Sequence, residues 1–315
     1  MARELRNVGA SVRARLLDRA REERSDFQLL LTRYALERLL YRLSVSPEHD
    51  RFVLKGAMLF AAWVDDPFRP TRDLDLLGYD HADTATMIDR FRTICAIEVP
   101  DDGVEFDIER LSAEPIRDDT GYGGIRVRTV ATIAGARVPI QVDVGFGDAV
   151  TPGPIEIEYP ILLDAPPPRL RAYPAETVVA EKFEALVSLG VANSRMKDFY
   201  DLWMISRAFG FQRAALSTAL RQTFGRRETD WPVETPTGLT DAFAVDKRGQ
   251  WRAFLTRERL ATTPEDFEAV VEDLRVFLVP LFSDHDHASV HWPPGGPWSA
   301  GAPGARTQSS EASPL

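Results

Sequence analysis

The sequence has a single cysteine, Cys95, and this scarcity excludes two kinds of structure. One thiol can form no intramolecular disulfide bond, and it cannot build a cluster of thiolate metal ligands. A chain with so few thiols fits a reducing compartment, so we expect a cytoplasmic protein. The 315 residues, 44% of them hydrophobic, are nevertheless enough to form the core of one large or two modest domains.

Long apolar runs are also missing. No stretch approaches the 18 or so consecutive apolar residues that a membrane-spanning helix needs. The N-terminus lacks the short apolar segment of a secretory signal peptide. We therefore expect a soluble protein with no membrane partner.

Charge is distributed unevenly along the chain. The net charge of −10 argues against binding of nucleic acid over the whole surface. Residues 1–43, however, carry ten arginines and six acidic residues, whereas residues 97–119 carry nine acidic residues and two arginines. The N-terminal segment could present a basic face to a polyanion, or it could be a solvated helix face.

The spacing of apolar residues predicts helices first, then strands. Residues 27–40 repeat apolar side chains at i, i+3 and i+4, which predicts a helix whose start is capped by Ser25 or Asp26. Segments that alternate apolar and polar residues follow, and two of them predict a hairpin that turns at Ala134 and Gly135. This part of the chain is expected to form a mixed sheet.

The second half of the chain is expected to be mostly helical. We predict an α+β protein with one domain over residues 1–165, comprising N-terminal helices and the sheet, and a helical domain over residues 172–285. The proline-rich stretch around residues 160–172 is expected to link them. Residues 290–315 are rich in Pro, Gly, Ser and Ala, which predicts a disordered tail.

Paired carboxylates are the strongest chemical signal. Asp73 and Asp75 are separated by one leucine in RDLDLLG, so a strand would project both from one face. Asp143, in the alternating run IQVDVGFGD, is the expected third carboxylate, and Asp148 is its rival. Oxygen ligands of this kind suit Mg²⁺, which completes its shell with water and substrate phosphates. Alone, the paired motif is weak, because solvated aspartates at strand ends are common.

A glycine turn lies upstream of the carboxylates. Gly56 follows a short β-type run and precedes a helical one, so its backbone N–H groups could bind phosphate at close range. Lys55 places a positive charge beside the turn. Together with three carboxylates, the turn predicts a two-metal site for phosphoryl or nucleotidyl transfer, with Asp143 nearest the attacking oxygen.

Five motifs in order, LKGAMLF, RPTRDLDLLG, VDV, AEKFEAL and RMKDFYDLW, resemble the AbiEii/MenT group of toxin nucleotidyltransferases. The resemblance runs from about residue 27 to residue 209 and implies a polymerase-β-like nucleotidyltransferase fold. It also implies a toxin of a toxin–antitoxin pair, with a cognate antitoxin as partner. Its implied activity is Mg²⁺-dependent transfer of a nucleoside monophosphate from an NTP to RNA, foremost the 3′ end of tRNA, which would block aminoacylation and translation.

The resemblance also implies roles for individual residues. Gly56 matches the turn glycine, Asp73 and Asp75 match the metal-binding pair, and Asp143 the third carboxylate. Lys182 matches the lysine of a helical EK motif, expected to hold the nucleotide phosphates. Asp198 matches the first aspartate of a KDxxD motif, expected to reach back into the active site. Without the resemblance, Lys182 and Asp198 would be interpreted as members of exposed ion pairs, although both lie beside apolar helix positions.

Two positions depart from the family pattern or are ambiguous. Ala57 stands where other members have Gly or Ser, so a hydroxyl contact to phosphate is missing and Lys55 could compensate. The hydroxyl of Thr71 could contact phosphate or could serve the local turn. The expected phosphate-binding residues are Lys55, Gly56, Ala57, Thr71 and Arg72.

Three other functions fit parts of the sequence. One is a nucleotidyltransferase that modifies a protein or a small molecule, and another is a catalytically decayed binding module. The intact carboxylates argue against decay, because metal ligands are usually lost first. A sugar-nucleotide transferase with a DxD motif is the third, and the helical half does not suit it.

Overall fold

The structure is a computed structural model that describes residues 7–63, 71–80, 82–116, 123–260, 264–282 and 290–300. Its helices are α1 (Val8–Glu22), α2 (Phe27–Ser44), α3 (Met58–Trp63), α4 (Thr84–Cys95), α5 (Ala175–Leu189), α6 (Met196–Ala208), α7 (Arg213–Arg226), α8 (Asp241–Glu258) and α9 (Phe267–Leu278). Its strands are β1 (Phe52–Lys55), β2 (Asp73–Gly78), β3 (Glu105–Phe106), β4 (Ser112–Ile116), β5 (Gly124–Ile133), β6 (Ala136–Phe146), β7 (Ile155–Glu158), β8 (Arg169–Ala172), β9 (Phe211–Gln212), β10 (Val290–Trp292) and β11 (Ser299–Ala300).

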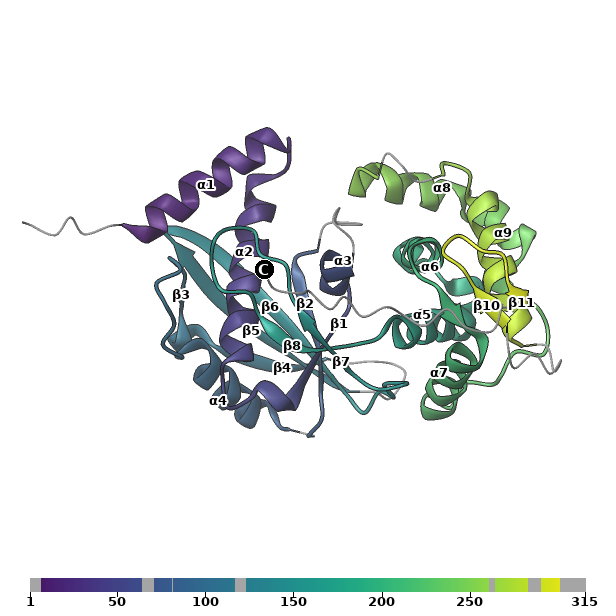
Figure 1. The fold of residues 1–315 in the computed structure, drawn as a ribbon, viewed down its shortest axis with the longest axis horizontal. Helices are drawn as coiled ribbons and strands as arrows, with labels where there is room; N and C mark the ends of the chain where they lie inside the picture. The colour runs from purple at the N-terminus through teal and green to yellow at the C-terminus, as the bar shows by residue number, and fades with distance from the viewer. Residues whose placement is uncertain are drawn as a thin grey trace, which may run out of the picture.

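A mixed sheet with α1–α4 forms one side of the molecule, and α5–α9 form the other (Figure 1). The sheet order is β3-β5-β6-β2-β1-β8-β7, and β4 also pairs with β5. Strand β2 runs parallel to β6 and antiparallel to β1, which makes the sheet mixed. The predicted α+β class, with a mixed sheet followed by helices, is confirmed.

The two faces of the sheet differ sharply. Alternation along β2 and β6 buries residues such as Leu74, Leu76 and Val142 on one face, against which α2 and α4 pack. The intervening residues, among them Asp75 and Asp143, stay partly exposed on the opposite face. Asp75 and Asp143 therefore lie on the face of the sheet that α2 and α4 do not cover.

The predicted N-cap and hairpin are both confirmed. The side chain of Asp26 accepts hydrogen bonds from the first turn of α2, as an N-cap does. The long strands β5 and β6 turn at Ala134 and Gly135, whose φ angles of 45° and 78° are both positive. This two-residue turn pairs Ile133 with Ala136 and sets the register of the whole hairpin.

The proline-rich segment is not a free linker. On α2, the buried carboxylate of Glu37 accepts the backbone N–H of Leu162, and the buried Arg38 donates to the carbonyl of Pro166. The segment then continues as β8, which pairs with β1 in the sheet. The linker prediction missed β8. The three adjacent prolines are typical of a linker, and the alternating run of residues 169–172 that follows them is too short to predict a strand by itself.

The prediction of a disordered tail is wrong for residues 290–300. Strand β10 pairs with β9 and β11, and Trp292 is only 3% exposed. The indole N–H groups of Trp292 and Trp298 donate to the carbonyls of Ser206 and Phe277. The prediction rested on the average composition of the segment, which is polar and small. The two tryptophans nevertheless supply enough apolar area to pack this part of the chain against the helices. Residues 301–315 lie outside the described residues.

No helix in the part of the chain that the structure describes is long and apolar enough to cross a membrane.

Candidate active site

Four charged residues lie in one row across the uncovered face of the sheet. In the strand register, Lys55 on β1 pairs with Asp75 on β2, Asp75 pairs with Asp143 on β6, and Asp143 pairs with Arg126 on β5. We call Lys55, Asp75, Asp143 and Arg126 the charged row. Two carboxylates therefore stand side by side at its centre, with a cation at each end.

The three predicted carboxylates are brought together. Asp73 precedes Asp75 by two residues on β2, so both project from the uncovered face, next to Asp143. Burial raises the pKa of Asp73 and of Asp75, and repulsion from Asp143 adds to the rise at both positions. A cation bound among these carboxylates would relieve that repulsion.

Asp143, the third predicted carboxylate, already forms an ion pair with Arg126. The Nε and one terminal nitrogen of Arg126 donate to the two oxygens of Asp143 over 2.8 and 2.7 Å, a bidentate ion pair. Among the described residues, no group of three or more His, Cys, Asp or Glu side chains is arranged to hold a metal ion. Asp143 could therefore join Asp73 and Asp75 around a cation only if Arg126 moved.

The glycine turn lies directly against Asp75. Gly56 has a φ of 74°, and a Cβ atom added there would lie 2.0 Å from Oδ2 of Asp75. Only glycine therefore allows the turn to approach the carboxylate so closely. The neighbouring Ala57 is buried in the core beneath the turn.

Replacing Gly56 with alanine is expected to reduce both stability and the activity proposed below. The Cβ atom would strain the positive-φ backbone and displace the carboxylate of Asp75, at a total cost of about 2–3 kcal/mol in the free energy of unfolding. Urea denaturation of the purified variant measures this cost.

Gly135→Ala is the matched control for that change. Gly135 has nearly the same φ, 78°, but an added Cβ would meet nothing within 4 Å. It should therefore lose only the strain component, about 1 kcal/mol. Equal losses in the two variants would show that the contact between Gly56 and Asp75 is unimportant.

Lys55 is held by a second group of carboxylates. Its Nζ donates to Asp148 over 2.6 Å and to Glu181, on α5, over 3.2 Å. Burial alone would lower the pKa of Lys55, but Glu181 and Asp148 outweigh it and raise that pKa. Asp148 therefore pairs with Lys55, whereas Asp143 is the carboxylate beside Asp75. The predicted contact between Lys55 and phosphate stays a prediction, and a phosphate would compete with two carboxylates.

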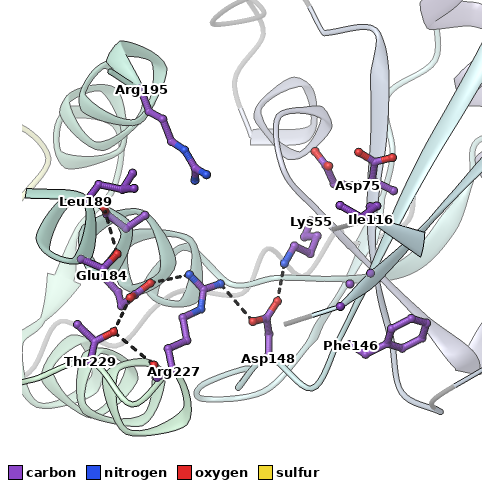
Figure 2. Close-up of a pocket in the computed structure, with 16 residues that line it drawn as sticks. Lys55, Asp75, Ile116, Phe146, Asp148, Glu184, Leu189, Arg195, Arg227 and Thr229 are labelled. Atoms are coloured by element: carbon purple, nitrogen blue, oxygen red, sulfur yellow. Dashed lines mark hydrogen bonds and ion pairs between the residues drawn. The ribbon is translucent and has the colours of Figure 1, made fainter. Parts of the chain in front are cut away.

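A pocket of about 330 Å³ lies between the sheet and the helices, next to this network. Figure 2 shows its sheet side with Lys55 and Asp75, and its helix side with Arg195, Glu184 and Arg227. Arg227 joins the two sides, since it donates to Asp148 over 3.2 Å and to Glu184 over 2.7 Å. Asp143 also lines the pocket, so the carboxylates of the sheet open onto it.

Lys182 lies in a buried cluster on the helix side. Its Nζ is 2.9 Å from Asp198 and 2.7 Å from Asp201, and both aspartates are buried. The EK and KDxxD motifs therefore meet across α5 and α6. The predicted contact of Lys182 with phosphate is untested, and here Lys182 neutralises two aspartates.

Lys197 is a cation that the sequence analysis did not single out. It lies one residue before Asp198, and its positive charge lowers the pKa of both Asp73 and Asp75. Arg195, two residues earlier, lines the pocket. The RMKDFYDLW motif thus supplies two cations at the start of α6, one at its N-cap and one in its first turn, and their place in the motif beside Asp198 was the available signal.

Thr71 and Arg72, the two remaining residues predicted to bind phosphate, lie just before the start of β2. The hydroxyl of Thr71 donates to the carbonyl of Asp73 over 3.2 Å, which is local turn chemistry. Arg72 is exposed and lies 4.0 Å from Asp26. Phosphate binding by Gly56, Ala57, Thr71 and Arg72 stays a prediction.

Comparisons with known proteins place this site in context. A family model described as nucleotidyl transferase AbiEii toxin, type IV toxin–antitoxin system, matches residues 38–273. No curated protein matches the chain. Among solved structures, JHP933 from Helicobacter pylori is 14% identical, with a TM-score of 0.46 over 82% of this chain and 93% of its own. A candidate nucleotidyltransferase of the same organism is 13% identical, with a TM-score of 0.45 over 82% and 100%.

Proposed function

Because the chain belongs to the AbiEii family of nucleotidyl transferase toxins of type IV toxin–antitoxin systems, we propose that it transfers a nucleoside monophosphate from an NTP to RNA. The proposed acceptor is the 3′ end of a tRNA, where an added nucleotide would block aminoacylation and translation. A cognate antitoxin is the proposed regulatory partner. The observation that supports transfer is the adjacency of Asp73, Asp75 and Asp143, which stand together beside a pocket lined by cations.

The donor atoms of the site fit Mg²⁺. Asp73 and Asp75 offer hard carboxylate oxygens. Burial and, to a smaller extent, repulsion from Asp143 raise their pKa values, and a divalent cation would relieve that repulsion. In this proposal Asp73 and Asp75 hold the ion, and Asp143 completes the ligand set. When bound, Mg²⁺ would neutralise charge on the phosphates of the NTP.

The chain itself supplies charges for the triphosphate. Arg195 lines the pocket from the helix side, and Lys197 lies close enough to act electrostatically on Asp73 and Asp75. We propose that these two cations, with the backbone of the Gly56 turn, orient the phosphates beside the carboxylates. Lys182 acts indirectly in this arrangement, since it fixes α5 against α6.

Two arginines near the pocket and the sheet are poorly placed to contact the backbone of the proposed tRNA. Arg227 is held by Asp148 and Glu184, and the side chain of Arg171 is only 24% exposed and donates to the carbonyl of Asp50. Neither arginine therefore presents a free guanidinium to solvent. The exposed arginines of α1 remain the proposed contact, because α2 buries two of its three arginines, and binding through α1 should weaken as salt rises.

Labelling of RNA tests the proposal. Purified protein is incubated with Mg²⁺, total cellular RNA and each of the four NTPs labelled at the α-phosphate. A labelled band of tRNA size is expected with at least one NTP, and chelation of the metal should abolish it. Label on protein alone would instead favour a protein acceptor, and no label with any NTP would contradict transfer altogether.

A further inference from the structure

Arg126 lies in the charged row but has no role in the function proposed above. It comes from β5, opposite Asp143, and its guanidinium takes both oxygens of that carboxylate. The pair is partly exposed, with side-chain exposures of 31% for Arg126 and 21% for Asp143. The ion pair can therefore exchange partners without unfolding the sheet around it.

The charge of Arg126 acts on two of the three carboxylates, Asp143 and Asp73. Its positive charge lowers the pKa of Asp73, against the effects of burial and of Asp143, which raise it. In the protein without a metal ion, Arg126 thus neutralises Asp143 and offsets the effect of that carboxylate on Asp73. A divalent ion that used Asp143 as a ligand would have to displace it, because both oxygens are engaged and the two cations repel.

A displaced guanidinium would find suitable partners nearby. Gly124, two residues before Arg126 on the same face of β5, lines the 330 Å³ pocket together with Asp143. A planar guanidinium binds two phosphate oxygens in the same forked geometry that it uses for a carboxylate. Phosphates that enter the pocket would therefore lie within the range of Arg126.

We propose that Arg126 positions the nucleotide by exchanging one anion for another. It holds Asp143 while the site is empty, and it turns to a phosphate group of the NTP when a divalent cation takes Asp143. This inference rests on the proposed function for the identity of the ligand. Arg126 would thus couple the binding of the metal ion to the binding of phosphate at the same site.

Binding measurements on Arg126→Gln test the inference without any transfer reaction. Binding of Mn²⁺ to the nucleotide-free protein is followed by electron paramagnetic resonance, and binding of an α,β-methylene NTP analogue in the presence of Mn²⁺ is followed by calorimetry. We expect the variant to bind Mn²⁺ about tenfold more tightly and the analogue about tenfold more weakly than the unmodified protein.

Arg128→Gln is the matched control. Arg128 lies two residues along β5 and pairs with Glu114, which is exposed, so its removal should leave both affinities within about twofold. Arg126→Lys keeps the positive charge but loses the bidentate donor geometry of the guanidinium, so it should weaken binding of the analogue several-fold. If Arg126→Gln does not melt cooperatively, the lysine variant takes its place in the test.

Unchanged or weaker Mn²⁺ binding in folded Arg126→Gln would overturn the inference and leave Arg126 as a fixed structural partner of Asp143. Unchanged binding of the analogue would overturn it as well. Failure of the proposed function gives a different pattern, since it would appear as absence of RNA labelling by the unmodified protein, whatever the affinities for Mn²⁺.

Discussion

Asp75→Asn is expected to reduce nucleotidyl transfer by about a thousandfold or more. Asp75 lies at the centre of the charged row, between Lys55 and Asp143, and the Gly56 turn lies against its carboxylate. Asparagine has nearly the same shape, so it removes one negative charge and leaves the packing in place. Initial rates of α-label incorporation into RNA measure the loss.

The same change is expected to stabilise the metal-free protein. Burial raises the pKa of Asp75, so the folded protein binds this proton more tightly than the unfolded chain does. The metal-free protein therefore loses stability as pH rises through the raised pKa, and Asp75→Asn removes that loss. At pH 7.5, in the presence of a chelator, the melting temperature should rise by about 2 °C.

An exposed aspartate provides the control for both measurements. Asp89 lies on α4, and its side chain is 73% exposed, so Asp89→Asn should leave the transfer rate and the melting temperature unchanged. Retention of more than about a tenth of the activity in Asp75→Asn would remove Asp75 from the reaction centre. A lower melting temperature would show that its charge stabilises the metal-free fold.

Lys182→Ala is expected to lower the free energy of unfolding by about 3–5 kcal/mol. The change leaves Asp198 and Asp201 buried without the ammonium group that lies within 3 Å of each. Loss of an ion-pair partner from a buried carboxylate is costly, and these two carboxylates lie where α6 packs on α5. Urea denaturation at pH 7.5, monitored by tryptophan fluorescence, measures the change.

A double variant separates lost stability from lost chemistry. Lys182→Met combined with Asp201→Asn removes a charge from each side of the ion pair, so it should recover at least half of the stability that Lys182→Met alone loses. A stable but inactive double variant would favour a direct role of Lys182 at the phosphates. If Lys182→Ala lost less than 1 kcal/mol, the buried cluster would not be what holds α5 to α6.

Local patterns were sufficient to predict the carboxylates. Alternation in RDLDLLG and IQVDVGFGD placed Asp73, Asp75 and Asp143 on exposed faces of strands, as observed. The parallel pairing of β2 with β6 was not derivable from spacing, because paired residues such as Asp75 and Asp143 are 68 positions apart (143 − 75) and no short turn sets their register. The expectation that they meet came from the ligand needs of a metal site and from the resemblance to a family, not from the spacing of the strands.

Arg126 could have been found from the sequence. A two-residue turn at Ala134 and Gly135 pairs residues whose numbers have a constant sum along β5 and β6, which places Arg126 opposite Asp143. The network of Lys55, Asp148, Glu181 and Arg227 could not, since four separate segments contribute to it. Long-range ion pairs of this kind depend on how the two halves of the chain pack.

Position-specific labelling of the NTP tests the central claim most directly. The protein is incubated with Mg²⁺ and tRNA, and the NTP carries its label at either the α- or the γ-phosphate. Nucleotidyl transfer predicts that α-label enters the 3′ end of the RNA, while γ-label leaves as pyrophosphate. Transfer of γ-label to RNA, or α-label that enters equally well with Asp75→Asn, would contradict the account.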